Sequence, residues 1–137
     1  MAVVTDLIRS EENGTISFGD YTLGAKSKVD NFEHAGDLYK VKTFGEITKL
    51  EKNGMFVYES VPGTAVTEMK ATESGVEFNV EGMEDAEITL GLMEETDYNV
   101  SVDGSVVGQM KTNLGGKLTI GAELNPDSVV HIKVERL

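Results

Sequence analysis

Apolar and polar residues alternate along most of the second half of the chain, as in strands that bury one face and expose the other. In "GVEFNVEG", Val76, Phe78 and Val80 share one face and polar residues share the other. The same period of two recurs in four further stretches, at residues 86–92, 98–102, 118–124 and 130–135. The pattern predicts an all-β, antiparallel fold.

Turn residues separate the alternating stretches. The dipeptides Asp103-Gly104 and Asn53-Gly54 favour the positive φ angles of tight type I′ hairpins. The stretch "HAGDLYKVKTFGEI" is the best candidate for a helix, because its apolar residues recur at about helical spacing. Its Val, Thr, Phe and Tyr residues favour strands. We therefore expect a strand there, with room for one helical turn at residues 44–47.

One candidate boundary divides the chain. The segment "SVPGTAV", at residues 60–66, contains the turn pair Pro62-Gly63. We expect a β-sandwich of about twelve strands. Its N-terminal β subdomain would span residues 1–61. An immunoglobulin-like β-sandwich subdomain would span residues 64–137, and the two could share one core.

The composition narrows the classes of partner. The chain has 137 residues, no cysteine, and 24 acidic against 12 basic residues, for a net charge of −12. Nucleic acids and anionic membranes both need a basic surface, so neither is an expected partner. The start of the chain lacks the basic region of a signal peptide, and no stretch is apolar enough to span a membrane. We therefore expect a cytoplasmic protein.

Catalytic groups are sparse. The chain has two histidines, His34 and His131, and neither lies near a recognisable nucleophile motif. The Gly-Gly pair in "NLGGK" is typical of a hairpin turn, because no helix follows it to bind phosphate. The sequence predicts a protein that is not an enzyme and has no cofactor.

Acidic turns are the weak candidates for a metal site. "EGMEDAE" and "MEETD" supply carboxylates that could meet at one end of a sandwich and bind Ca²⁺. The candidate ligands are Glu84, Asp85, Glu94 and Asp97. The alternative is that these turns are simply solvated, since the spacing of an EF-hand is absent.

The stretch "GMFVYES" is apolar on both faces. Phe56 and Tyr58 would share one face, and Met55 and Val57 the other. Such a strand is either covered on both sides or keeps one face for a partner. Phe56 and Tyr58 are therefore the candidate interface residues. Tyr58 and Tyr39 are also the candidates for stacking on a sugar, since the chain has no tryptophan.

Two stretches carry resemblances to known proteins. The segment "YNVSVDGSVVGQMKTNLGGKLTI" resembles accessory β-sandwich modules of polysaccharide-degrading enzymes. "MAVVTDLIRS", "KTFGEITKLEKNGMFVYESVPGTAV" and "KTNLGGKL" are similar to a family of small proteins of Gram-positive anaerobes. Those proteins often carry the label "endosialidase catalytic beta chain". The resemblance implies a compact all-β protein with no established activity.

The residues do not support the sialidase label. Sialidases hold the substrate carboxylate with three arginines, and this chain has only Arg9 and Arg136. The sialidase Asp-box also requires a tryptophan, and this chain has none.

The expected function is therefore that of a non-enzymatic structural or protein-interaction protein that self-associates into a homo-oligomer. Free sheet edges and the doubly apolar strand both favour this interpretation. The alternative is a carbohydrate-binding accessory module, with a glycan as its ligand.

Overall fold

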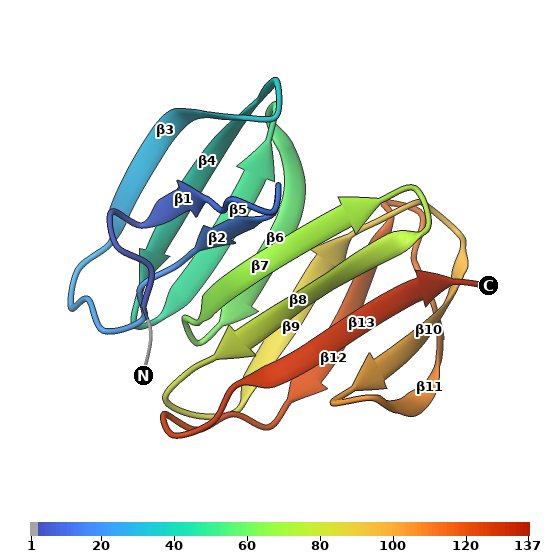
Figure 1. Cartoon of the computed structure of the whole chain (residues 1–137). Coiled ribbons are helices and arrows are strands. Elements are labelled where there is room, and N and C mark those ends of the chain that lie inside the picture. The colour runs from blue at the N-terminus through green and yellow to red at the C-terminus, as the bar shows by residue number, and fades with distance from the viewer. Residues whose placement is uncertain (1–2) are drawn as a thin grey trace.

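A computed structural model of the chain describes residues 3–137 as two antiparallel β-sheets packed face to face. The first two residues of the predicted subdomain 1–61 lie outside the described residues. Sheet A has seven strands in the order β1-β2-β7-β8-β13-β10-β11, and sheet B has six in the order β12-β9-β6-β5-β4-β3. Figure 1 views the sandwich from the side of sheet A, with β7, β8 and β13 in front of β9 and β12. The prediction of an all-β antiparallel sandwich is confirmed.

The described residues form thirteen strands, against about twelve predicted. Their bounds are β1 Ile8–Ser10, β2 Ile16–Phe18, β3 Ser27–His34, β4 Asp37–Phe44, β5 Ile47–Lys52, β6 Met55–Val61, β7 Ala65–Thr72, β8 Gly75–Glu81, β9 Ala86–Gly91, β10 Asp97–Val102, β11 Ser105–Lys111, β12 Lys117–Ala122 and β13 Val130–Arg136. The ambiguous stretch forms β4 and the start of β5, with a turn at residues 45–46 in place of a helical turn.

The predicted turns and buried faces are confirmed. Asn53 and Gly54 have φ angles of 51° and 80°, and Asp103 and Gly104 have φ angles of 50° and 85°, as type I′ hairpins require. Every residue assigned to the buried face of β8 and β13 lies in the core. Alternation and turn chemistry together therefore set the register of these strands.

The two halves of the chain are not separated in space. Strand β2 of the first half pairs with β7 of the second, and β6 pairs with β9. One core cluster contains Phe18 and Leu50 from the first half together with Phe78 and Ile132 from the second. The two halves therefore share both sheets and one core, the alternative that the sequence left open.

The immunoglobulin-like arrangement of the second half is not confirmed. Its seven strands divide into five in sheet A and two in sheet B. The constant-type immunoglobulin fold divides seven strands into four and three. The difference arises because β6 of the first half completes sheet B beside β9.

A buried network of hydroxyl groups lies where the chain crosses from β6 in sheet B to β7 in sheet A. The Thr64 side chain bonds the Tyr58 hydroxyl at 2.7 Å and the Ser60 hydroxyl at 2.8 Å. The Thr64 backbone N–H donates to Thr48 Oγ1 at 3.1 Å, and the Thr48 hydroxyl donates to the Thr64 carbonyl at 2.8 Å. Because these groups are fully buried, each bond replaces one that water would otherwise make.

The direction of the remaining bonds in the network follows from proton count. A hydroxyl carries one proton, and Thr48 gives its proton to the Thr64 carbonyl. Thr43 must therefore donate to Thr48 across their 2.8 Å contact. Thr43 in turn accepts a bond from the Asp20 backbone N–H at 2.9 Å. The network thus ties the loop after β2 to β4, β5 and the crossover.

Tyr21 is the opposite case to Tyr58. Its side chain is buried, and its hydroxyl has no hydrogen-bond partner among the described residues. A buried polar group without a partner destabilises the folded state.

The two tyrosines should respond in opposite directions to the same substitution. Tyr58→Phe removes one buried bond of the network and should lower the free energy of unfolding by about 1 kcal/mol. Tyr21→Phe removes an unpaired hydroxyl and should leave the free energy of unfolding unchanged or raise it. Urea denaturation of both variants beside the wild type measures the difference. Equal losses in the two variants would show that the Thr64 network contributes nothing specific.

Candidate functional site

The structure separates Phe56 from Tyr58, which the sequence placed on one face. In β6, Phe56 pairs with Glu51 and Tyr58 pairs with Leu50, so a β-bulge makes Val57 the extra residue. Tyr58 is 0% exposed and forms edge-to-face contacts with Phe18 at 5.2 Å and Phe78 at 5.7 Å. The prediction that Tyr58 contacts a partner or stacks on a sugar is therefore wrong, because its ring fills the centre of the core.

Phe56 lies on the outer face of sheet B and is partly exposed. It shares that face with Glu51, opposite the buried Leu50. A Cβ atom on Gly91 would lie 2.2 Å from the Phe56 carbonyl oxygen and 3.1 Å from the ring, so glycine is required where the Phe56 backbone approaches β9. Lys117 Nζ lies 4.6 Å from the centre of the ring and Lys49 Nζ lies 5.9 Å from it, within cation–π range. Phe56 thus remains accessible to a ligand or partner.

Tyr39 lies at an opening between the sheets. A pocket of about 170 Å³ is lined by residues of both sheets, among them His34, Asp37, Tyr39 and Lys52. Lys52 Nζ lies 3.4 Å from Asp37 Oδ2, and the bond from Asn53 and the Lys52 charge lower the pKa of Asp37 despite some desolvation. The Tyr39 ring is half-buried and meets His34 edge to face. This wall offers hydrogen-bonding groups rather than an open stacking surface.

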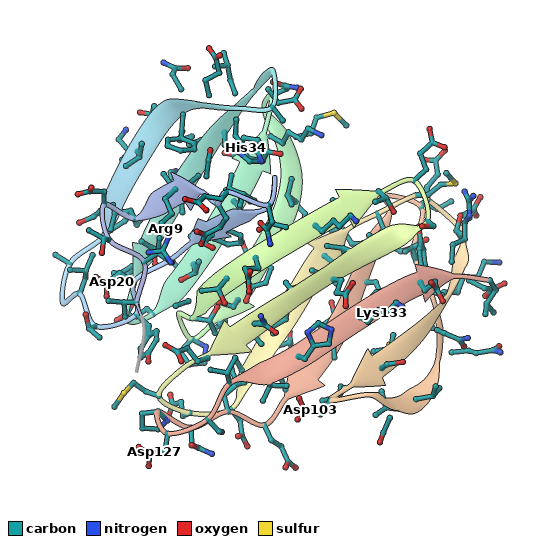
Figure 2. All side chains as sticks on the ribbon, viewed as in Figure 1. Arg9, Asp20, His34, Asp103, Asp127 and Lys133 are labelled. Carbon is teal, nitrogen blue, oxygen red and sulfur yellow. The ribbon has the colours of Figure 1, made fainter. Side chains whose placement is uncertain are left out.

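The two histidines have structural partners. His34 Nε2 donates to the Gly14 carbonyl at 3.2 Å, so Nδ1 is left to bond the Ser10 hydroxyl at 2.7 Å. His34 therefore joins the β3–β4 hairpin of sheet B to the β1–β2 hairpin of sheet A (Figure 2). His131 lies 2.8 Å from both Asn79 Oδ1 and Glu77 Oε2 on the outer face of sheet A.

The predicted calcium ligands do not meet. Glu84 and Asp85 precede β9, whereas Glu94 and Asp97 follow it. A six-residue strand is about 20 Å long, so the two acidic turns lie at opposite ends of the sandwich. Asp85 Oδ1 instead accepts a bond from the Leu124 backbone N–H at 3.0 Å. Within residues 3–137, no group of three or more histidine, cysteine or carboxylate side chains could hold a metal ion.

The edge strand β11 is the feature that sequence reasoning missed. Strand β11 pairs only with β10, and its sequence "SVVGQMK" is exposed on both faces. Val106, Val107 and Met110 are 67%, 62% and 40% exposed. Large apolar side chains gathered on a free sheet edge are typical of a surface that meets another protein. The missing alternation of "SVVGQMK" was the available signal, since neither face has the residues of a core strand.

No helix among residues 3–137 is long and apolar enough to cross a membrane.

Comparison with known proteins gives no match: no family model, no curated protein and no solved structure is similar to the chain. The family resemblance given by the sequence therefore stays a prediction.

The buried tyrosines predict a loss of stability at alkaline pH. Burial raises the pKa of Tyr58 in the folded state, and burial together with the charges of Glu81 and Asp20 raises the pKa of Tyr21 to about 12. In the unfolded chain both pKa values are about 10. Above pH 10 the unfolded chain releases protons that the folded protein retains, so the free energy of unfolding should fall as pH rises.

Urea denaturation between pH 8 and pH 11.5 measures this dependence. A variant with both Tyr21→Phe and Tyr58→Phe should show a shallower fall than the wild type above pH 10, and the same dependence below it. Identical slopes above pH 10 would contradict the assignment to these two side chains.

Proposed function

We propose that the protein is a non-enzymatic interaction protein that self-associates edge to edge through β11. The observation that supports this most directly is the combination of an unpaired strand edge with exposed apolar side chains on that same strand. A free edge presents a row of backbone N–H and C=O groups that a second strand can pair with.

The charge of β11 favours a second copy of the chain as its partner. The whole chain carries a net charge of −12, which repels another copy over most of its surface. Strand β11 has no acidic residue, and its single charged residue is Lys111. Strand β11 therefore adds no acidic charge to the repulsion between two copies.

Sheet B has two edge strands, β3 and β12, and the edge formed by β3 is protected against pairing. Strand β3 carries Lys28, Asp30 and Glu33. Charged residues are a usual device that prevents pairing at an edge. Strand β1, at the far edge of sheet A, has only three residues.

Strand β11 contains a β-bulge. Gly108 pairs with Val100 and Val106 pairs with Ser101, so Val107 is the extra residue. Val106 therefore lies on the outer face of sheet A, whereas Met110, which pairs with Tyr98, lies on the inner face. A Cβ atom on Gly108 would have no neighbour within 4 Å, so this point of the edge is open to close approach.

Substitution Val106→Lys tests this interface. The substitution adds a charge to the free edge, as natural edge strands do, and reduces the net negative charge. A loss of association then cannot come from stronger repulsion between the copies as a whole. We expect light scattering to give the mass of two chains of 14.8 kDa for the wild type and of one chain for the variant.

Leu114→Lys is the matched control. Leu114 is 76% exposed in the loop after β11, and the charge change is the same. The control should keep the mass of the wild type. A wild type that stays monomeric at the highest concentration measured would contradict the proposal. An equal loss of mass in Val106→Lys and Leu114→Lys would also contradict it.

A further inference from the structure

Three lysines lie directly opposite one another on the outer face of sheet B. Lys49 of β5 pairs with Lys42 of β4, and Lys42 pairs with Lys28 of β3. Neighbouring strands are about 4.8 Å apart, so the row extends over about 10 Å. We call these three residues the lysine row.

The lysine row is unfavourable in the protein alone. Like charges directly opposite each other on neighbouring strands destabilise a sheet. The chain has twice as many acidic as basic residues, so lysines facing lysines run against its composition. Lys28 Nζ lies 3.8 Å from Asp30, but among the described residues no ion pair reaches Lys42 or Lys49. A conflict of this kind is typical of a surface that binds an external anion.

Sheet B continues the lysine row with groups of a different kind. Beyond Lys49 the same register passes through Glu59 and Thr89 to Thr119, and the hydroxyls of the two threonines lie 3.1 Å apart. The partly exposed Phe56 ring lies in the adjacent register of the same face. Along the line that crosses the strands, the face therefore presents three cations, the carboxylate of Glu59 and two hydroxyl groups, with one aromatic ring beside them.

The combination selects a class of ligand. Cations bind carboxylates, hydroxyl groups bond sugar hydroxyls, and an aromatic ring packs on the apolar face of a sugar. The row crosses several strands on the outer side of a sheet, which suits an extended polymer. The net charge of −12 repels a dense polyanion such as nucleic acid most strongly, and it also repels a second copy of the chain. A sugar polymer with carboxylates carries a lower density of charge.

We infer that the outer face of sheet B binds a linear polysaccharide that carries carboxylate groups, with Lys28, Lys42 and Lys49 as its anion-binding residues. This site is separate from the β11 edge. The lysine row lies on β3, β4 and β5 of sheet B, whereas β11 forms an edge of sheet A.

Two polymers that share one backbone test the charge directly. Polygalacturonate carries a carboxylate on each sugar, and its fully methyl-esterified form carries none. Calorimetry on the full chain should show binding to polygalacturonate that weakens with added salt, and at least tenfold weaker binding to the ester. Equal binding of the two polymers, or no binding of polygalacturonate, would overturn the inference.

Lys42→Gln tests the protein side, with Lys133→Gln as its control. Lys42 lies at the centre of the lysine row, whereas Lys133 lies on β13 in the outer face of sheet A, as Figure 2 shows. Lys42→Gln should weaken the binding of polygalacturonate about tenfold and should not lower the unfolding temperature, because it relieves repulsion within the row. Lys133→Gln should leave binding unchanged. Equal losses in both variants would show attraction to net charge only, and would overturn the site.

Two further measurements distinguish binding of a polysaccharide from binding of nucleic acid or of a second copy of the chain. A single-stranded oligonucleotide should bind more weakly than polygalacturonate, and equal or tighter binding would overturn the assignment to a polysaccharide. The native mass should be the same for Lys42→Gln and the wild type. A lower mass for Lys42→Gln would instead assign the lysine row to contact with a second copy. That outcome is distinct from failure of the β11 interface, which Val106→Lys reports independently.

Discussion

The bonds of Thr64 determine how the two sheets are joined. Thr64 follows the cis Val61–Pro62 peptide, at the point where the chain leaves sheet B and enters sheet A. Its backbone is bonded to Thr48 of sheet B, and its side chain is bonded to Tyr58 and Ser60 of the same sheet. Tyr58 in turn packs edge to face on Phe18 and Phe78 of sheet A. Because the N–H, carbonyl and hydroxyl groups of Thr64 all have partners, the apolar faces of both sheets can close over this residue without leaving one of these groups unpaired.

Much of this fold could be predicted from the sequence because it depends on patterns within single strands and turns. Alternation predicted which side chains of β8, β9, β10, β12 and β13 would be buried, and the Asn53-Gly54 and Asp103-Gly104 pairs predicted two hairpins. The hydrogen-bond network around Thr64 could not be predicted from the sequence. Its threonines and serine lie on four separate segments, and a hydroxyl in a strand gives no sign in the sequence of whether it is buried or exposed. Long-range pairing, such as that of β2 with β7, was likewise beyond local patterns.

The candidate site was predicted less well, and the reason is the β-bulge at Val57. One extra residue reverses the face of every side chain beyond it. Tyr58 therefore lies in the core while Phe56 lies outside, although a strict period of two assigns them to one face. The prediction of a calcium site at the two acidic turns was wrong for a related reason. They are close in sequence, but β9 lies between them and carries them to opposite ends of the sandwich.

The net charge of the chain does not describe the local charge on each part of its surface. Acidic residues outnumber basic ones two to one, yet β11 has no acidic residue and three strands of sheet B bring lysines face to face. Net charge governs repulsion at long range, whereas contact depends on the charges within about one Debye length, roughly 8 Å at physiological salt. An acidic protein can therefore keep a nearly neutral edge for its own copies and a cationic row for an anionic ligand. The general repulsion then acts against denser polyanions and against association anywhere else on the surface.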